Sequence, residues 1–203
     1  MRRLSPSYPP DTLKLWEVKI MRYSILKTAS EELLSLESVK AHLRTLPNDT
    51  EEDNLILLPL ITAAREYCEN LTDCGFVPQT IKAYPTDAQT HLPRAPITKV
   101  TSVTIYHDDG TSETLSADSD YSCDLDDGLL VIHAELDGLR KFNPIEVEYE
   151  AGYSTLPPIV AEAMKLLIGH WYANRESVQT GATTAVEIAE TTKAILKQYR
   201  RWW

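Results

Sequence analysis

Acidic side chains gather in one stretch of the chain, where they could bind a cation. Eight Asp and Glu residues lie in the stretch from Asp108 to Asp127, and no Lys or Arg lies among them. A calcium loop of the EF-hand type needs acids at its positions 1, 3 and 5, glycine at 6 and glutamate at 12. Counted from Asp124, glycine falls at position 5 and leucine at position 6, so the register fails. We interpret the stretch as the acidic turns of exposed hairpins, and no metal site is predicted.

The residue types of a catalytic triad are also present. The chain has five histidines, but none stands in a Gly-x-Ser-x-Gly turn or a His-Glu-x-x-His pair, and no nucleotide-binding fingerprint occurs. His42 and His170 lie beside apolar positions of expected helices, where a hydrogen-bonded packing histidine is the commoner case. The sequence therefore predicts a protein that is not an enzyme and needs no cofactor. A small cytosolic enzyme or regulator is the least favoured alternative.

The cysteines indicate a reducing compartment. Cys68, Cys74 and Cys123 are an odd number, and the first two are too far apart for a Cys-x-x-Cys zinc knuckle. The two arginines near the N-terminus are not followed by an apolar segment, so no secretory signal is expected. The longest apolar run, Leu55 to Ile61, is far shorter than the ~20 residues that cross a bilayer. No membrane partner is predicted.

The C-terminal residues are of the types that bind proteins. Trp and Arg are enriched among the residues that carry most of the energy of protein interfaces. Two interpretations stay open: the tail folds back on its own core, or it anchors in the groove of a partner. For the second interpretation the predicted binding residues are Lys197, Tyr199, Arg200, Arg201, Trp202 and Trp203.

The elements that would position these residues begin after an N-terminal arm, residues 1–24. A short helix is expected from Ser35 to about Pro47, and a longer one begins after Asn48–Thr50, which are good N-cap residues. The long helix is apolar nearly all round between Leu55 and Ile61, so we expect it to be central or shared with a neighbouring copy. Pro59 predicts a kink or a late start.

Strand patterns follow from about residue 76. Two Asp-Asp-Gly turns, at 108–110 and 126–128, separate apolar runs and predict hairpins. Two C-terminal helices complete the pattern, the first of them beginning at Pro157-Pro158. The fold class is α+β, a helical bundle of about four helices with an inserted antiparallel β module. The predicted division is 1–24, an arm; 25–75, helical; 76–154, the β module; and 155–203, the C-terminal helices.

Composition sets further limits. The 203 residues carry 20 Lys and Arg against 30 Asp and Glu, a formal net charge of −10. The affinity of a protein for nucleic acid comes mainly from basic residues that neutralise phosphates. Tight non-specific DNA binding is therefore disfavoured, and any DNA-binding face would be small and local.

Six segments, read together in this order, resemble the head-tail connector (adaptor) family of tailed bacteriophages, the group similar to the connector of phage HK97 and the adaptor of phage SPP1. The resemblance covers about residues 34–203. The segments are Leu36–Arg44 (LESVKAHLR), Leu60–Tyr67 (LITAAREY), Leu92–Ile97 (LPRAPI), Val147–Tyr153 (VEYEAGY), Leu166–Glu176 (LLIGHWYANRE) and Tyr199–Arg201 (YRR).

This resemblance implies a structural virion protein that forms a ring, typically of twelve copies, below the portal. The ring would extend the DNA channel and join the DNA-filled head to the next neck or tail protein, with DNA passing through and not specifically bound. The C-terminal residues named above would insert into the portal. The apolar helix would pack between subunits, through Leu55, Ile56, Leu57, Leu58, Leu60 and Ile61. Another neck component, a head-closure or tail-completion protein, is the alternative.

Overall fold

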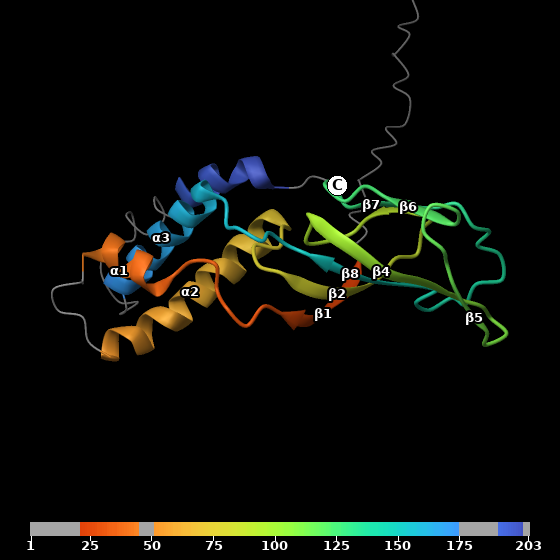
Figure 1. The fold of residues 1–203 in the computed structure, drawn as a ribbon, viewed down its shortest axis with the longest axis horizontal. Coiled ribbons are helices and arrows are strands. Elements are labelled where there is room, and N and C mark those ends of the chain that lie inside the picture. Colours follow the sequence, from red (N-terminus) through yellow and green to blue (C-terminus); the bar gives the residue numbers. More distant parts are fainter. Residues whose placement is uncertain (1–20, 45–50, 175–190, 201–203) are drawn as a thin grey trace, which may run out of the picture.

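The computed structural model describes residues 21–44, 51–174 and 191–200. Figure 1 shows an elongated molecule with its helices at one end and its strands at the other. The helical end contains α1 (Leu36–Leu43), α2 (Glu51–Thr72) and α3 (Pro158–Ala173). Residues 191–196 are also helical and lead into the 3-10 turn η2 (Lys197–Tyr199). The predicted α+β class is confirmed.

The helix ends follow local sequence signals. The side chain of Ser35 accepts a hydrogen bond from the backbone N–H of Ser38 at 3.2 Å and caps α1. Helix α3 has a proline at its first position, where the missing N–H costs nothing. Helix α2 begins at Glu51 and continues through Pro59. The late start expected at this proline is therefore wrong.

The strands form two antiparallel sheets. One has five strands in the order β1-β2-β8-β4-β5, and the other has three in the order β3-β7-β6. The strands are β1 (Arg22–Thr28), β2 (Gln79–Tyr84), β3 (Gln89–His91), β4 (Ile97–Tyr106), β5 (Ser112–Thr114), β6 (Tyr121–Cys123), β7 (Leu129–Ile132) and β8 (Ile145–Ala151). Both predicted Asp-Asp-Gly turns join neighbouring strands, β4 to β5 and β6 to β7. Gly110 and Gly128 have φ of 87° and 76°, values that favour glycine.

Strand β1 was not predicted. It pairs along β2, from Arg22 opposite Tyr84 to Thr28 opposite Gln79, so the five-stranded sheet takes its edge strand from the N-terminal side of the helices. The predicted boundary between an arm and a helical part, after residue 24, falls inside this strand. Residues 25–28 are extended and belong to the sheet. The five-stranded sheet thus contains a strand from before the helices in addition to strands of the predicted β module.

Each end of the molecule has its own core. In the strand end, inward side chains of β2, β4 and β8 alternate with outward ones, and Ile81, Val147 and Tyr149 are fully buried. In the helical end, Leu57, Ile61 and further apolar residues of α2 pack against α3. The junction between the two cores contains charged groups, which are described next.

Candidate functional site

The described residues offer little for catalysis or metal binding. Among them, no group of three or more His, Cys, Asp or Glu side chains is arranged to hold a metal ion. Burial, with a smaller effect of Glu69, raises the pKa of the Cys68 thiol to about 12, and burial likewise raises that of Cys123 to about 11. These thiols are poor nucleophiles at neutral pH. No helix in the described ranges is long and apolar enough to span a membrane.

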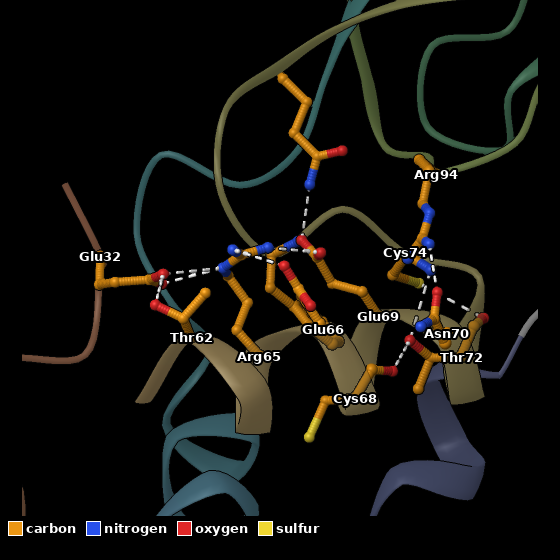
Figure 2. Close-up of polar contacts among 12 residues, drawn as sticks. Glu32, Thr62, Arg65, Glu66, Cys68, Glu69, Asn70, Thr72, Cys74 and Arg94 are labelled. Carbon is orange, nitrogen blue, oxygen red and sulfur yellow. Dashed lines mark hydrogen bonds and ion pairs between the residues drawn. The ribbon is translucent and has the colours of Figure 1, made fainter. Parts of the chain in front are cut away.

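A buried carboxylate on α2 joins the helical end to the strand end (Figure 2). Glu69 is 2% exposed. Its Oε1 accepts hydrogen bonds from the backbone N–H of Phe76 at 2.8 Å and from Nε2 of Gln79 at 2.7 Å. Its Oε2 accepts one from Nη1 of Arg65 at 2.8 Å. Burial raises the pKa of Glu69, and the hydrogen bond from Phe76 and the nearby Arg65 oppose that effect.

Arg65 connects Glu69 to the segment that follows β1. Its Nε donates to Oε2 of Glu32 at 2.9 Å, and the Thr62 hydroxyl donates to Oε1 of the same carboxylate at 2.9 Å. Burial acts to lower the pKa of Arg65, but its hydrogen bond to Glu32 and the charge of Glu69 raise it above its usual value. The guanidinium is thus charged and satisfied on both sides, so Glu32, Arg65 and Glu69 hold three segments in one arrangement.

A second arginine strengthens this junction. Arg94 is 6% exposed and donates to the side-chain oxygen of Asn70 on α2 and, at 3.2 Å, to the Tyr23 hydroxyl on β1. Arg94, in the loop before β4, therefore links helix α2 to the edge strand through polar side chains. This junction sets the orientation of the two ends.

The predicted subunit-interface residues divide into two groups. Leu57 and Ile61 are 0% and 1% exposed, so their side chains belong to the core of the chain itself. Leu55 and Leu58 are 75% and 51% exposed. Ile56 and Leu60 are half-buried. The all-round apolar stretch is therefore an inner face that packs on α3 and an outer face that solvent reaches.

The described part of the C-terminal segment packs on the helical core. Leu196 is 1% exposed. The ring of Tyr199 meets that of Phe76 edge-on, with centroids 6.3 Å apart, and its carbonyl accepts a hydrogen bond from the Cys74 thiol at 3.3 Å. Of the predicted portal-binding residues, Tyr199 is thus half-buried within the chain, which fits the interpretation of a tail that folds back as far as this residue.

Beside this packed segment lies a hollow of about 280 Å³ with an apolar floor and a basic rim. Lys197 and Arg200 are exposed at that rim. Arg201, Trp202 and Trp203 lie outside the described residues. The lining residues are Leu71, Lys193, Ala194, Leu196, Lys197 and Arg200.

The buried junction was missed at the sequence level. One signal was available: Arg65 and Glu69 are four residues apart, the spacing of an ion pair on a helix, and they follow the apolar positions of the core face. The partners Glu32 and Gln79 come from distant segments. No local pattern predicts that these segments meet.

Comparisons with known proteins place the chain in a structural context. A model of a family described as head completion protein matches residues 32–202. No curated protein that was compared with the chain matches it.

Among solved structures, a chain of the virion of a native gene transfer agent particle is 21% identical, with a TM-score of 0.66 over 90% of this chain and 97% of that one. A chain of the neck of the native particle, computed with C12 symmetry, is 20% identical with a TM-score of 0.65, also over 90% and 97%. A chain of the neck of the empty particle, computed with C6 symmetry, is 20% identical with a TM-score of 0.63 over the same shares. These likenesses show a common fold.

Proposed function

The chain belongs to the head completion protein family, and from that premise we propose that it forms a ring in the neck of a phage-like particle. A protein that completes a head has a structural role, so the family confirms the prediction that the chain is not an enzyme. Within the family, we propose the connector (adaptor) type, which lies below the portal and joins the head to the next neck or tail protein.

The observation that carries this proposal is the match to neck chains over nearly their whole length. Those necks were computed with twelve-fold and six-fold symmetry. A ring of identical copies uses a heterologous contact, in which two different faces of the chain meet at every interface. We propose a ring of this kind, with twelve copies in the virion.

The outer face of α2 supports one side of such a contact. Leu55 and Leu58 lie one turn apart on the helix and are exposed, although leucine side chains of this size gain about 1.5–3 kcal/mol each from full burial. Leu57 and Ile61 hold the same helix to its own core from the other side. We propose that Leu55 and Leu58, together with the half-buried Ile56 and Leu60, pack against the neighbouring subunit.

The C-terminal end is the proposed portal-binding surface. The basic rim at Lys197 and Arg200 surrounds an apolar hollow, and the residues that follow are Arg201, Trp202 and Trp203. Arg and Trp are the types that dominate protein interfaces. The net charge of −10 suits a ring through which DNA slides, because a wall poor in cations binds phosphates weakly.

A head-closure or tail-completion protein is a second candidate, since head completion does not specify which protein of the neck the chain is. A pull-down separates the two. A connector is retained by isolated portal rings, whereas a head-closure protein is retained by connector and tail but not by portal.

The structure specifies which truncation to use in that experiment. Removal of Tyr199 to Trp203 would delete the contacts with Phe76 and Cys74 and disturb the fold. Removal of residues 201–203 leaves them intact. We expect this shorter truncation to lose portal binding while its unfolding temperature stays unchanged. Retention of the truncated chain by portal would contradict the proposed portal-binding surface.

A further inference from the structure

One edge of the strand end carries a basic and aromatic patch, defined here as Arg22, Tyr84, Arg140, Lys141 and Phe142. The guanidinium of Arg22 lies over the ring of Tyr84, 5.1 Å from its centroid, and over that of Phe142 at 5.6 Å. Phe142 is 70% exposed, which is high for a side chain of its size. The patch thus presents a large apolar ring flanked by positive charge.

The patch is held in place without ion pairs. Arg140 lies over the ring of Tyr106 at 3.9 Å, and its Nε donates to the carbonyl of Asn143 at 2.9 Å. Within the described ranges, no carboxylate lies within ion-pair distance of Arg22, Arg140 or Lys141. Arginines stacked on aromatic rings lose little freedom on binding, and charges that no acid neutralises attract an acidic partner.

A second edge of the strand end, at β6 of the three-stranded sheet, is acidic. Asp118, Asp120 and Asp124 flank β6, in the stretch between His107 and Asp127 that holds no Lys or Arg. We name these three residues the acidic edge. Asp120 accepts a hydrogen bond from the backbone of Ser116 at 2.7 Å, so its carboxylate is fixed. Figure 1 shows β6 and β7 along the upper side of the strand end and β1, which carries Arg22, along the lower side.

We propose that the basic and aromatic patch of one copy binds the acidic edge of a second copy of this chain. The two surfaces carry opposite charge and lie on different elements, the patch on β1, β2 and the loop before β8 and the acidic edge beside β6 of the other sheet, and a head-to-tail contact joins two such different surfaces. Phe142 supplies the apolar anchor, and Lys141 and Arg22 meet the carboxylates. This inference rests on the ring proposed above and adds a second contact, in the strand end, to the one at α2.

DNA is a less fitting occupant. Aromatic rings bind nucleic acid by stacking on unpaired bases, and a duplex offers none at its surface. Three cations on a chain of net charge −10 provide few phosphate contacts. A second copy brings the complementary charge itself.

Crosslinking tests the contact between two proteins that each carry one introduced, accessible cysteine, since the remaining Cys68 and Cys74 are buried. Both are full-length chains with Cys123→Ser; one carries Lys141→Cys and the other, with a longer tag, carries Asp118→Cys. They are mixed and treated with a short bis-maleimide crosslinker. The control mixture replaces Lys141→Cys by Lys99→Cys. Lys99 is an exposed lysine of β4, in the sheet that also contains β1. The native chain, treated separately with an amine-reactive crosslinker, reports whether copies associate at all.

We expect a mixed dimer, identified by its size, in the first mixture and background in the control, together with a ladder of oligomers for the native chain. A ladder without the mixed dimer would overturn this inference and leave the ring proposal standing. Equal mixed dimer in both mixtures would also overturn the inference, because the contact would then not be specific to the patch. Absence of both ladder and mixed dimer would contradict the ring proposal as well.

Discussion

The two halves of helix α2 reverse the usual distribution of side chains. Its C-terminal half buries Arg65 and Glu69, which are 7% and 2% exposed, whereas its N-terminal half exposes Leu55 and Leu58 to 75% and 51%. Charged residues are almost never buried unless they are paired. A single exposed leucine needs no explanation, but here two leucines are exposed one turn apart on the same helix. Both departures occur within one continuous helix of 22 residues.

The two halves differ in whether these side chains have partners within the chain. The buried pair has further hydrogen-bond partners within the chain, Glu32 for Arg65 and Gln79 and the backbone of Phe76 for Glu69. No such partner covers the two exposed leucines in the described structure. We therefore propose that the C-terminal half of α2 gives the subunit its rigidity and that the N-terminal half serves assembly. The predictions below separate these two roles by free energy of unfolding and by association.

The largest effect on folding is expected from Glu69→Ala. This change removes the acceptor of Nη1 of Arg65, of the N–H of Phe76 and of Nε2 of Gln79, and leaves Glu32 as the remaining carboxylate on Arg65. Removing one member of a buried ion pair costs about 3–5 kcal/mol of unfolding free energy, because the other charge stays buried. Urea unfolding measures the loss.

Glu66→Ala is the matched control. Glu66 lies 3.8 Å from the same guanidinium, but its side chain is 62% exposed, and exposed pairs contribute about 0–1 kcal/mol. Equal losses in the two variants would contradict the role of the buried pair.

A smaller effect is expected from Tyr199→Ala, at the C-terminal end. The ring contacts Phe76 edge-on from a half-buried position, and aromatic pairs contribute about 0.5–1.5 kcal/mol beyond the area that they bury. We expect a loss of about 1–2 kcal/mol in the same unfolding measurement. A stability identical to that of the native chain would mean that this segment is not part of the core.

Tyr172→Phe tests how the N-terminal half of α2 is attached. The hydroxyl of Tyr172 on α3 donates to Oδ1 of Asp53 at 2.8 Å, and a hydrogen bond of this kind contributes about 1 kcal/mol. We expect a loss of that size, with the oligomer ladder of the native chain retained. Loss of the ladder would show that the assembly face depends on this bond for its position.

The smallest effect on folding is expected from Leu55→Ser combined with Leu58→Ser. Exposed side chains away from caps and cores change stability by about 0.5 kcal/mol or less. Amine crosslinking of this variant is expected to give monomer only. The companion variant Leu57→Ser, which alters a fully buried residue of the same stretch, is expected to unfold readily. A normal ladder from the double variant would remove α2 from the proposed subunit interface.

Much of the fold followed from local signals. The two Asp-Asp-Gly turns, the helix start at Ser35 and the proline at the start of α3 each depend on a few neighbouring residues, and all were predicted correctly. Strand β1 was missed because its exposed side chains are both polar and apolar, so they give no strand pattern. Its partner, β2, lies more than 50 residues away along the chain. The buried junction was missed for the same reason, since Glu32 and Gln79 reach α2 only in the folded chain.

For the candidate site, too, the sequence predicted the local features and not those that depend on packing. The apolar stretch Leu55–Ile61 could be found from the sequence, but its division into a core face and an exposed face required the packing of α3. At the C-terminus, the sequence left folding back and docking open. The structure assigns Tyr199 to the core, and Arg201, Trp202 and Trp203 lie outside the described residues.

The most direct test of a neck function is negative-stain microscopy of particles made without this protein. The account predicts DNA-filled or emptied heads that lack tails, beside free and complete tails, with tailed particles restored when the native chain is supplied. Intact tailed particles in the absence of the protein would contradict the account.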